Sequence, residues 1–181
     1  MLLAALFFTT PSATGGIPIS GYVCPSCPSV TDPAALFSAL LTEPLADPYI
    51  TINVAFAGFD ANGNATNLFD TKTWSLTAAT VQSLQKSATP PRLVMLSVGG
   101  GDGAVLSCAS PMPSFASTLA HSLLDMIHTY GFDGIDWDIE HRTGDMVRCG
   151  EIISSVMTTM KSESKSLKFS IAPQVRFVHI K

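Results

Sequence analysis

The sequence alternates between short apolar stretches typical of β-strands and longer amphipathic stretches typical of α-helices. The predicted strands cover residues 17–23, 50–57, 92–98, 132–140 and 167–173. The predicted helices between them cover residues 33–41, 75–87, 114–130 and 145–162. This alternation predicts an α/β fold with a parallel sheet whose strands are joined by helical crossovers.

Two α/β folds fit this pattern, an open dinucleotide-binding sheet and a TIM barrel. The dinucleotide-binding sheet carries a G-x-G-x-x-G turn after its first strand. Here the residues after the first predicted strand read CPSCP, and the glycine cluster at residues 99–103 lacks the required spacing. We therefore set the dinucleotide-binding fold aside and expect a TIM barrel.

The composition limits the classes of partner. Of the 181 residues, 46% are hydrophobic and only 13% are charged, which is typical of a globular chain and not of a disordered one. The formal net charge is −4, and there is neither a basic stripe for nucleic acid nor a polybasic patch for a membrane surface. We therefore expect a neutral molecule as partner, with no nucleic acid and no membrane.

The first 16 residues have features of a secretory leader. An apolar run at residues 2–8 is followed by small and polar residues. The run is shorter than the roughly 20 apolar residues that span a bilayer. No Lys or Arg precedes it, so a start site inside a longer gene is the alternative. We expect residues 1–16 to be a signal peptide or a disordered N-terminus, and the protein to be secreted.

Four cysteines fit a secreted chain with disulfides. They are Cys24, Cys27, Cys108 and Cys149. The C-x-x-C pair is also half of a zinc site, but no second pair has metal-ligand spacing, so we expect no metal. The tripeptide NAT beginning at Asn64 is a glycosylation sequon in a loop rich in Gly and Asn. Asn64 is therefore a candidate glycosylation site in a secreted chain.

The stretch DGIDWDIE at residues 133–140 carries acidic residues at alternating positions. Because side chains alternate across a strand, Asp136, Asp138 and Glu140 are predicted to share one face. Crowded carboxylates repel each other, but crowding also raises the pKa of one member, which can then act as an acid. A cation site or a solvated edge strand is the competing interpretation. The position at the C-terminal end of a strand favours catalysis, because TIM-barrel enzymes keep catalytic groups there.

Two motifs make the chain resemble the family 18 glycoside hydrolases. Residues 133–140 match the family's D-x-x-D-x-D-x-E signature at every fixed position, and residues 97–100 (SVGG) match its S-x-G-G motif. Residues 52–57 (INVAFA) and 172–174 (APQ) resemble the ends of the family's second and fifth strands, and the first strand is a looser match. The resemblance implies that residues 17–181 are a partial TIM-barrel catalytic domain.

The resemblance implies substrate-assisted retaining hydrolysis of chitin or other N-acetylglucosamine-containing polysaccharides, without a cofactor. In this scheme the substrate's own 2-acetamido group is the nucleophile, an exception to the usual two-carboxylate mechanism. Carried over by position, Glu140 protonates the glycosidic oxygen and later activates water. Asp138 binds and orients the acetamido N–H, and Asp136 lies behind Asp138 and shares a proton with it.

Six further residues are candidates for binding substrate or supporting the carboxylates. They are Ser97, Gly99, Gly100, Gln174, Tyr22 and Phe56. The serine is expected to hydrogen-bond Asp136, and the glycines to leave room for the sugar. The two aromatic residues are of the kind that lines sugar grooves, with packing in the core as the alternative. The glutamine lies at a predicted strand end that faces the site.

The cysteines fit this layout, because Cys24, Cys108 and Cys149 follow the first, third and fourth predicted strands. All three then fall on the catalytic side of the barrel. We expect a Cys108–Cys149 bridge between adjacent loops, with Cys24 and Cys27 as a local pair.

Eight strand–helix units would need roughly 300 residues, within the range of this fold. Five strand patterns are present, so we expect this chain to be the N-terminal part of such a domain and to be inactive alone if the remaining units are needed. Two alternative functions remain open. One is a non-catalytic chitin-binding lectin, which commonly lacks the acid that Glu140 provides here. The other is an endo-β-N-acetylglucosaminidase acting on N-glycans.

Overall fold

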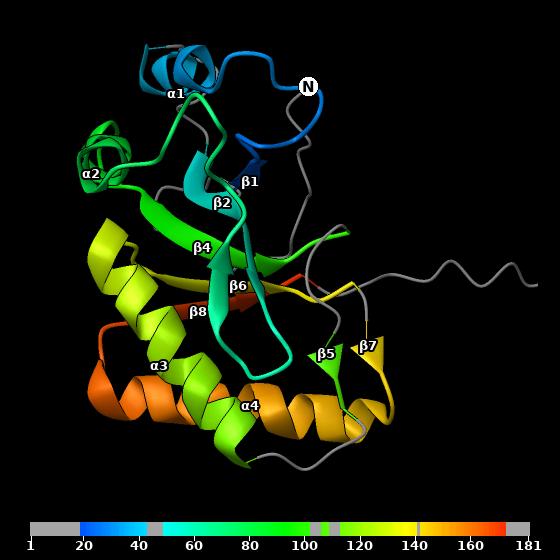
Figure 1. Cartoon of the computed structure of the whole chain (residues 1–181). Coiled ribbons are helices and arrows are strands. Elements are labelled where there is room, and N and C mark those ends of the chain that lie inside the picture. Colours follow the sequence, from blue (N-terminus) through cyan, green and yellow to red (C-terminus); the bar gives the residue numbers. More distant parts are fainter. Residues whose placement is uncertain (1–18, 43–48, 102–105, 109–112, 141, 173–181) are drawn as a thin grey trace, which may run out of the picture.

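A computed structural model of the protein describes residues 19–42, 49–101, 106–108, 113–140 and 142–172. The predicted leader at residues 1–16 and the candidate residue Gln174 lie outside the described residues. Figure 1 shows a curved central sheet with helices along its outer side and a small separate strand pair beside α4.

The described part of the chain has an all-parallel core sheet of consecutive strands. In spatial order these are β1 (Ile19–Val23), β2 (Tyr49–Phe59), β4 (Leu93–Gly99), β6 (Gly134–Asp138) and β8 (Lys168–Ile171). The helices that connect them are α1 (Pro33–Thr42), α2 (Ala78–Lys86), α3 (Pro113–Tyr130) and α4 (Met146–Glu163). Each strand pairs in parallel with the strand before it. This is the winding of a (β/α)8 barrel with about five of its eight units, and it confirms the predicted fold class.

The outer face of this sheet is apolar and forms the core with the helices. Strand residues of this face are almost fully buried, namely Ile52, Val54, Val94, Leu96, Val98, Ile135 and Trp137. They pack against apolar stripes of the helices, for example Val81 and Leu84 of α2 and Val156 and Met160 of α4. Burial of this face stabilises the fold and leaves the opposite face of each strand for polar side chains.

Helix boundaries follow local capping. Asp145 caps α4 by accepting a hydrogen bond from the Val147 backbone N–H, so the helix begins within one residue of the predicted start at residue 145. Thr77 caps α2 by accepting from the Thr80 backbone N–H, so that helix begins at Ala78. The predicted start at residue 75 was therefore three residues too early, because a threonine side chain at this position competes with helical continuation.

The loop that was expected around Asn64 is in part a strand, so this prediction was wrong in part. Strand β2 continues to Phe59 and turns back into β3 (Ala65–Asn67), which pairs antiparallel with β2. Asp60 stabilises the turn by accepting hydrogen bonds from the backbone N–H groups of Asn62 and Asn64. Three-residue strands carry too little alternation to be separated from a loop by sequence pattern.

A two-stranded parallel sheet was not predicted at all. It pairs β5 (Leu106–Ser107) with β7 (Arg142–Thr143), and so joins the loop after β4 to the loop after β6. A Cys108–Cys149 disulfide reinforces the same junction, and a second disulfide joins Cys24 to Cys27. Both disulfides have the pairing that was expected from the layout.

The two disulfides are expected to differ in their contribution to stability. The Cys108–Cys149 bond spans 41 residues and the Cys24–Cys27 bond spans 3. Chain-entropy arguments give about 4 kcal/mol for the longer loop and about 2 kcal/mol for the shorter one. We expect the Cys108→Ser/Cys149→Ser double variant to lose more free energy of unfolding in urea than the Cys24→Ser/Cys27→Ser variant. Equal losses would contradict this ranking.

Candidate active site

The centre of the candidate site is the carboxylate of Asp136, which is only 2% exposed on the inner face of β6. It accepts three hydrogen bonds from hydroxyl groups. Its Oδ2 accepts from Tyr22 Oη at 2.7 Å and from Ser97 Oγ at 3.0 Å, and its Oδ1 accepts from Ser170 Oγ at 2.5 Å. Donors to both oxygens stabilise the ionised carboxylate where water is excluded.

Sheet register brings these groups to one level. Asp136 lies opposite Ser97 of β4 on one side and opposite Ser170 of β8 on the other. Residues opposite each other in neighbouring strands point to the same face. Tyr22 reaches the same carboxylate from β1, which β2 and β4 separate from β6. Side chains of three other strands thus donate to the one buried carboxylate that β6 carries.

Asp138 lies one step further along the same face and is partly buried. Burial, then the charge of Glu140, then the charge of Asp136 raise the pKa of Asp138 from 3.8 to about 6. Its carboxyl group therefore changes protonation near neutral pH, as expected for one member of a crowded acidic group.

Glu140 follows the end of β6 and is half-buried. Strand β6 ends at Asp138, so the prediction of a strand to residue 140 was two residues too long. A Cβ added to Gly101 would lie 3.4 Å from Glu140 Oε2, which places this carboxylate beside the loop after β4. The acid thus lies between the C-terminal ends of β4 and β6, where a barrel has its mouth.

Glycine is required at residues 99 and 100, at the end of β4, because other parts of the chain approach the backbone closely there. Gly99 has φ +119°, and a Cβ there would lie 2.2 Å from the Asp138 carbonyl oxygen. Gly100 has φ +79°, and a Cβ there would lie 2.7 Å from the Phe56 ring. The Gly100 backbone N–H also donates to the Asp138 carbonyl oxygen at 2.7 Å. These glycines therefore let the chain turn against β6 and fix the backbone that carries Asp138.

Both aromatic candidates lie at this site. The Phe56 ring is partly buried at an irregularity in the β2–β4 pairing, and its centroid is 6.5 Å from that of Tyr22. Burial first, and then the charge of Asp136, raise the pKa of Tyr22 above its ordinary value. The Tyr22 hydroxyl therefore remains protonated and donates to Asp136.

Ser170 was missed by sequence reasoning. It lies within the predicted strand at residues 167–173, but a serine in a short strand carries no distinctive pattern. The signal that could have found it is its alternation with the apolar residues Phe169 and Ile171, which puts the serine on the inner face. Asn64, the candidate glycosylation site, lies away from the carboxylates on the exposed turn between β2 and β3.

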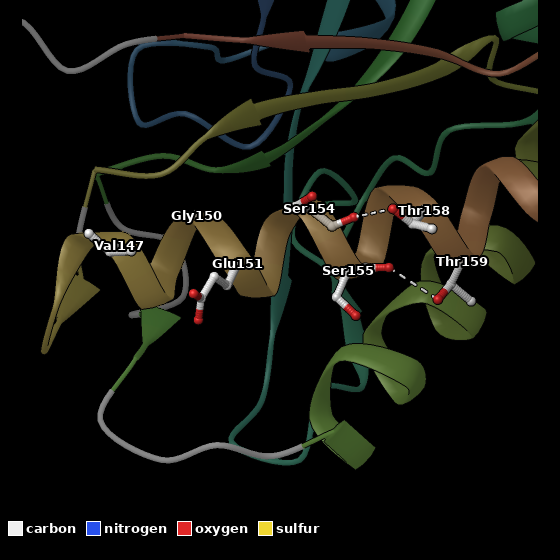
Figure 2. A pocket seen from close by; sticks show the side chains of 7 residues that line it. All are labelled: Val147, Gly150, Glu151, Ser154, Ser155, Thr158 and Thr159. Carbon is white, nitrogen blue, oxygen red and sulfur yellow. Dashed lines mark hydrogen bonds between the residues drawn. The ribbon is translucent and has the colours of Figure 1, made fainter.

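A groove along α4 is separate from this site. Figure 2 shows it along the outward surface of the helix, lined by Val147, Gly150, Glu151, Ser154, Ser155, Thr158 and Thr159. Two of its hydroxyls are already engaged, because Thr158 donates to the Ser154 carbonyl oxygen and Thr159 to the Ser155 carbonyl oxygen. The groove contains none of the three carboxylates and offers no chemistry of its own.

Within the described ranges, no group of three or more His, Cys, Asp or Glu side chains is arranged to hold a metal ion. In that same part of the chain, no helix combines the length and apolar character that crossing a membrane would require.

The raised pKa of Asp138 predicts a pH dependence of stability. The folded state binds this proton more tightly than the unfolded state, so the stabilisation is complete below pH 3.8 and is lost as pH rises through about 6. We expect Asp138→Asn to gain free energy of unfolding relative to the wild type between pH 4 and pH 7.5. Urea unfolding at both pH values measures this, with Asp125→Asn, an exposed change on α3, as the control. A difference that does not change with pH would contradict the prediction.

Comparison with known proteins finds relatives that are named as a chitinase and as a Nod factor hydrolase. Chitinase 1 of Tulipa saxatilis subsp. bakeri is 32% identical over 115 residues, which are 62% of this chain and 36% of that protein. Nod factor hydrolase protein 1 of Medicago truncatula is 28% identical over 101 residues, covering 54% of this chain and 26% of that protein. The chain thus spans about a third or less of these relatives.

Solved structures agree on the fold. The ChiA C-terminal domain of Legionella pneumophila superposes with a TM-score of 0.58 at 28% identity, covering 86% of this chain and 46% of that one. The catalytic domain of a family GH18 chitinase from the fern Peteris ryukyuensis gives a TM-score of 0.62, covering 85% of this chain and 57% of that one. At 23% identity the fern enzyme supports the fold alone.

A family model agrees with the motifs and the fold. The model described as glycosyl hydrolases family 18 matches residues 29–180. This range includes the SVGG motif at residues 97–100, the acidic motif at residues 133–140 and every described strand after β1. On this match, the chain belongs to glycosyl hydrolase family 18.

Proposed function

We propose that this protein hydrolyses β-1,4-linked N-acetylglucosamine polymers, chitin or chito-oligosaccharides, by substrate-assisted retaining catalysis. The observation that carries the proposal is the Asp136–Asp138–Glu140 series, with its middle carboxyl poised at a pKa of about 6. A purely structural sheet would gain nothing from burying such a series. A reaction that needs both a proton donor and a stabiliser of positive charge can use a series that contains both protonated and ionised carboxyl groups.

Glu140 is the proposed general acid and base. It lies at the barrel mouth and is half-buried, so a glycosidic oxygen can approach it while bulk water is partly excluded. In the forward step Glu140 donates its proton to the leaving oxygen, and the bond from that oxygen to the anomeric carbon breaks. The substrate's acetamido carbonyl oxygen attacks the same carbon and forms a cyclic intermediate. Glu140 then takes a proton from the incoming water, whose oxygen bonds to the anomeric carbon as the bond from that carbon to the acetamido oxygen breaks.

Asp138 is the proposed partner of the acetamido group. Its carboxylate accepts a hydrogen bond from the acetamido N–H, which orients the carbonyl oxygen toward the anomeric carbon and stabilises the positive charge that develops. The buried negative charge of Asp136 strengthens this effect from behind. Sharing of a proton between Asp136 and Asp138 is part of the proposal, because the charge of Asp136 is one cause of the raised pKa of Asp138.

Further proposals concern the residues that contact the substrate and the compartment in which the protein works. Tyr22 and Phe56 present aromatic surface beside the carboxylates and are proposed to contact the sugar. Room for the sugar at Gly99 and Gly100 remains a proposal, beside the close contacts with Asp138 and Phe56 that these glycines allow. Gln174 remains a proposed substrate contact. We also propose that the protein is secreted and glycosylated at Asn64, since two disulfides favour an oxidising compartment and that asparagine is exposed.

The test is hydrolysis of a fluorogenic chito-oligosaccharide by the purified chain and by two glutamate variants. Glu140→Gln is expected to lower kcat by at least about 100-fold, because it removes the proton donor without changing its shape. Glu151→Gln, an exposed change in the α4 groove, is the matched control and is expected to keep wild-type turnover.

Other outcomes distinguish the alternatives. Turnover unaffected by Glu140→Gln would overturn the proposed role of this residue. Binding to chitin beads by a wild-type chain without turnover would indicate a lectin. Release of glycans from a glycoprotein, without cleavage of chito-oligosaccharides, would indicate an endo-β-N-acetylglucosaminidase.

A further inference from the structure

Ser170 differs from the other donors to Asp136 in the oxygen that it reaches. Tyr22 and Ser97 both donate to Oδ2, whereas Ser170 donates to Oδ1 at 2.5 Å. Among the described residues, Ser170 is the donor that engages Oδ1. A carboxylate held through one oxygen keeps rotational freedom about its Cβ–Cγ bond, whereas donors on both oxygens fix its plane.

The backbone holds Ser170 at the right level. Two hydrogen bonds flank it along the β6–β8 ladder: the Lys168 N–H donates to the Asp133 carbonyl oxygen at 3.0 Å, and the Ala172 N–H donates to the Trp137 carbonyl oxygen at 2.8 Å. Between them Ser170 pairs directly with Asp136. Ser170 itself is exposed, and strand register places its hydroxyl against the buried Asp136 carboxylate.

The hydrogen bond from Ser170 to Asp136 affects the charge that lies beside Asp138. A hydroxyl donor stabilises the ionised form of a carboxylate, and the effect is largest where the group is buried. The negative charge on Asp136 is in turn one cause of the raised pKa of Asp138. The other ionisable groups that face this pair are Glu140 after β6 and Tyr22 of β1, and Lys168, the charged residue of β8, is exposed. Strands β2 and β4 face the pair with uncharged side chains, including Asn53 and Ser97.

We propose that Ser170 is a positioning residue, whose hydroxyl fixes the Asp136 carboxylate and keeps the negative charge on Asp136 beside Asp138. The inference rests on the proposed hydrolysis for its functional meaning, but its physical content can be tested without turnover. Without the hydroxyl, the Asp136 carboxylate loses its donor on Oδ1, and its negative charge is less stabilised and less firmly placed behind Asp138. That charge then contributes less to stabilising the positive charge that develops on the substrate.

A matched pair of substitutions isolates the hydroxyl. Ser170→Thr keeps the hydroxyl, whereas Ser170→Val lacks it and gives a side chain of nearly the same shape as threonine. Both are β-branched residues that suit a strand. Ser170→Ala provides a second hydroxyl-free variant, and Ser154→Ala, an exposed change on α4, controls for loss of an unrelated serine. Thermal unfolding of each full-length variant checks that the fold is retained.

The first readout is a site-resolved titration of the side-chain carboxyl carbons by ¹³C NMR. In the wild type, in Ser170→Thr and in Ser154→Ala, we expect the Asp138 signal to move near pH 6. In Ser170→Val and Ser170→Ala, we expect the Asp138 signal to move at a lower pH, because the charge of Asp136 that raises the pKa of Asp138 is less stabilised. An Asp138 signal that moves at the wild-type pH in both hydroxyl-free variants would overturn the inference, whatever the activity of the chain.

The second readout is turnover of the fluorogenic chito-oligosaccharide. We expect kcat to fall roughly 10-fold in Ser170→Val, with a smaller change in KM, and to be restored in Ser170→Thr, since a hydrogen bond to a charged group is lost. An equal loss in Val and Thr variants would indicate a packing role and overturn the inference. An inactive wild type with the expected titration would contradict the proposed function but support the role of Ser170 on Asp136.

Discussion

The buried carboxylate of Asp136 is the constraint on which the inner face of the sheet depends. An ionised carboxylate at 2% exposure is costly unless its oxygens are hydrogen-bonded. Here the three donors come from three other strands, so the anion is satisfied only when β1, β4, β6 and β8 are all in register. The same contacts that stabilise the charge therefore select one arrangement of the strands.

The two faces of the sheet have different roles: the outer face stabilises the fold, and the inner face carries the polar groups of the candidate site. The outer face buries Leu96, Trp137 and similar side chains against the helices, and this burial supplies most of the favourable free energy of folding. The inner face carries hydroxyls and carboxylates that contribute little to that term. Alternation along each strand is what allows the two roles to coexist in five residues of β6, where Ile135 and Trp137 point one way and Asp136 and Asp138 the other.

Much of this arrangement could be predicted from the sequence, because it depends on short-range periodicity. Alternation in residues 133–140 predicted the shared face of the carboxylates, and the resemblance to family 18 predicted the hydrogen bond from Ser97 to Asp136. The helix and strand order also predicted the parallel sheet. These features depend on local pattern and on the general rule that consecutive β/α units lie side by side.

Other features could not be predicted, because they depend on contacts between residues far apart in the sequence or on strands of only two or three residues. Ser170 becomes significant only when register places it opposite Asp136, and register is not visible in a serine flanked by apolar residues. The pairs β2–β3 and β5–β7 involve strands of two or three residues, which leave no periodic signal. The role of Gly99 likewise depends on how closely a neighbouring strand approaches it.

The Cys108–Cys149 bond has a topological consequence for the acidic strand. Its 41-residue separation encloses α3, β6 and the residues up to the first turn of α4. Asp136, Asp138 and Glu140 all lie within this covalent ring. In an oxidised chain that unfolds, the carboxylates remain in a closed loop with the helix that precedes them, so the entropy lost when this part of the sheet re-forms is smaller than for an open chain.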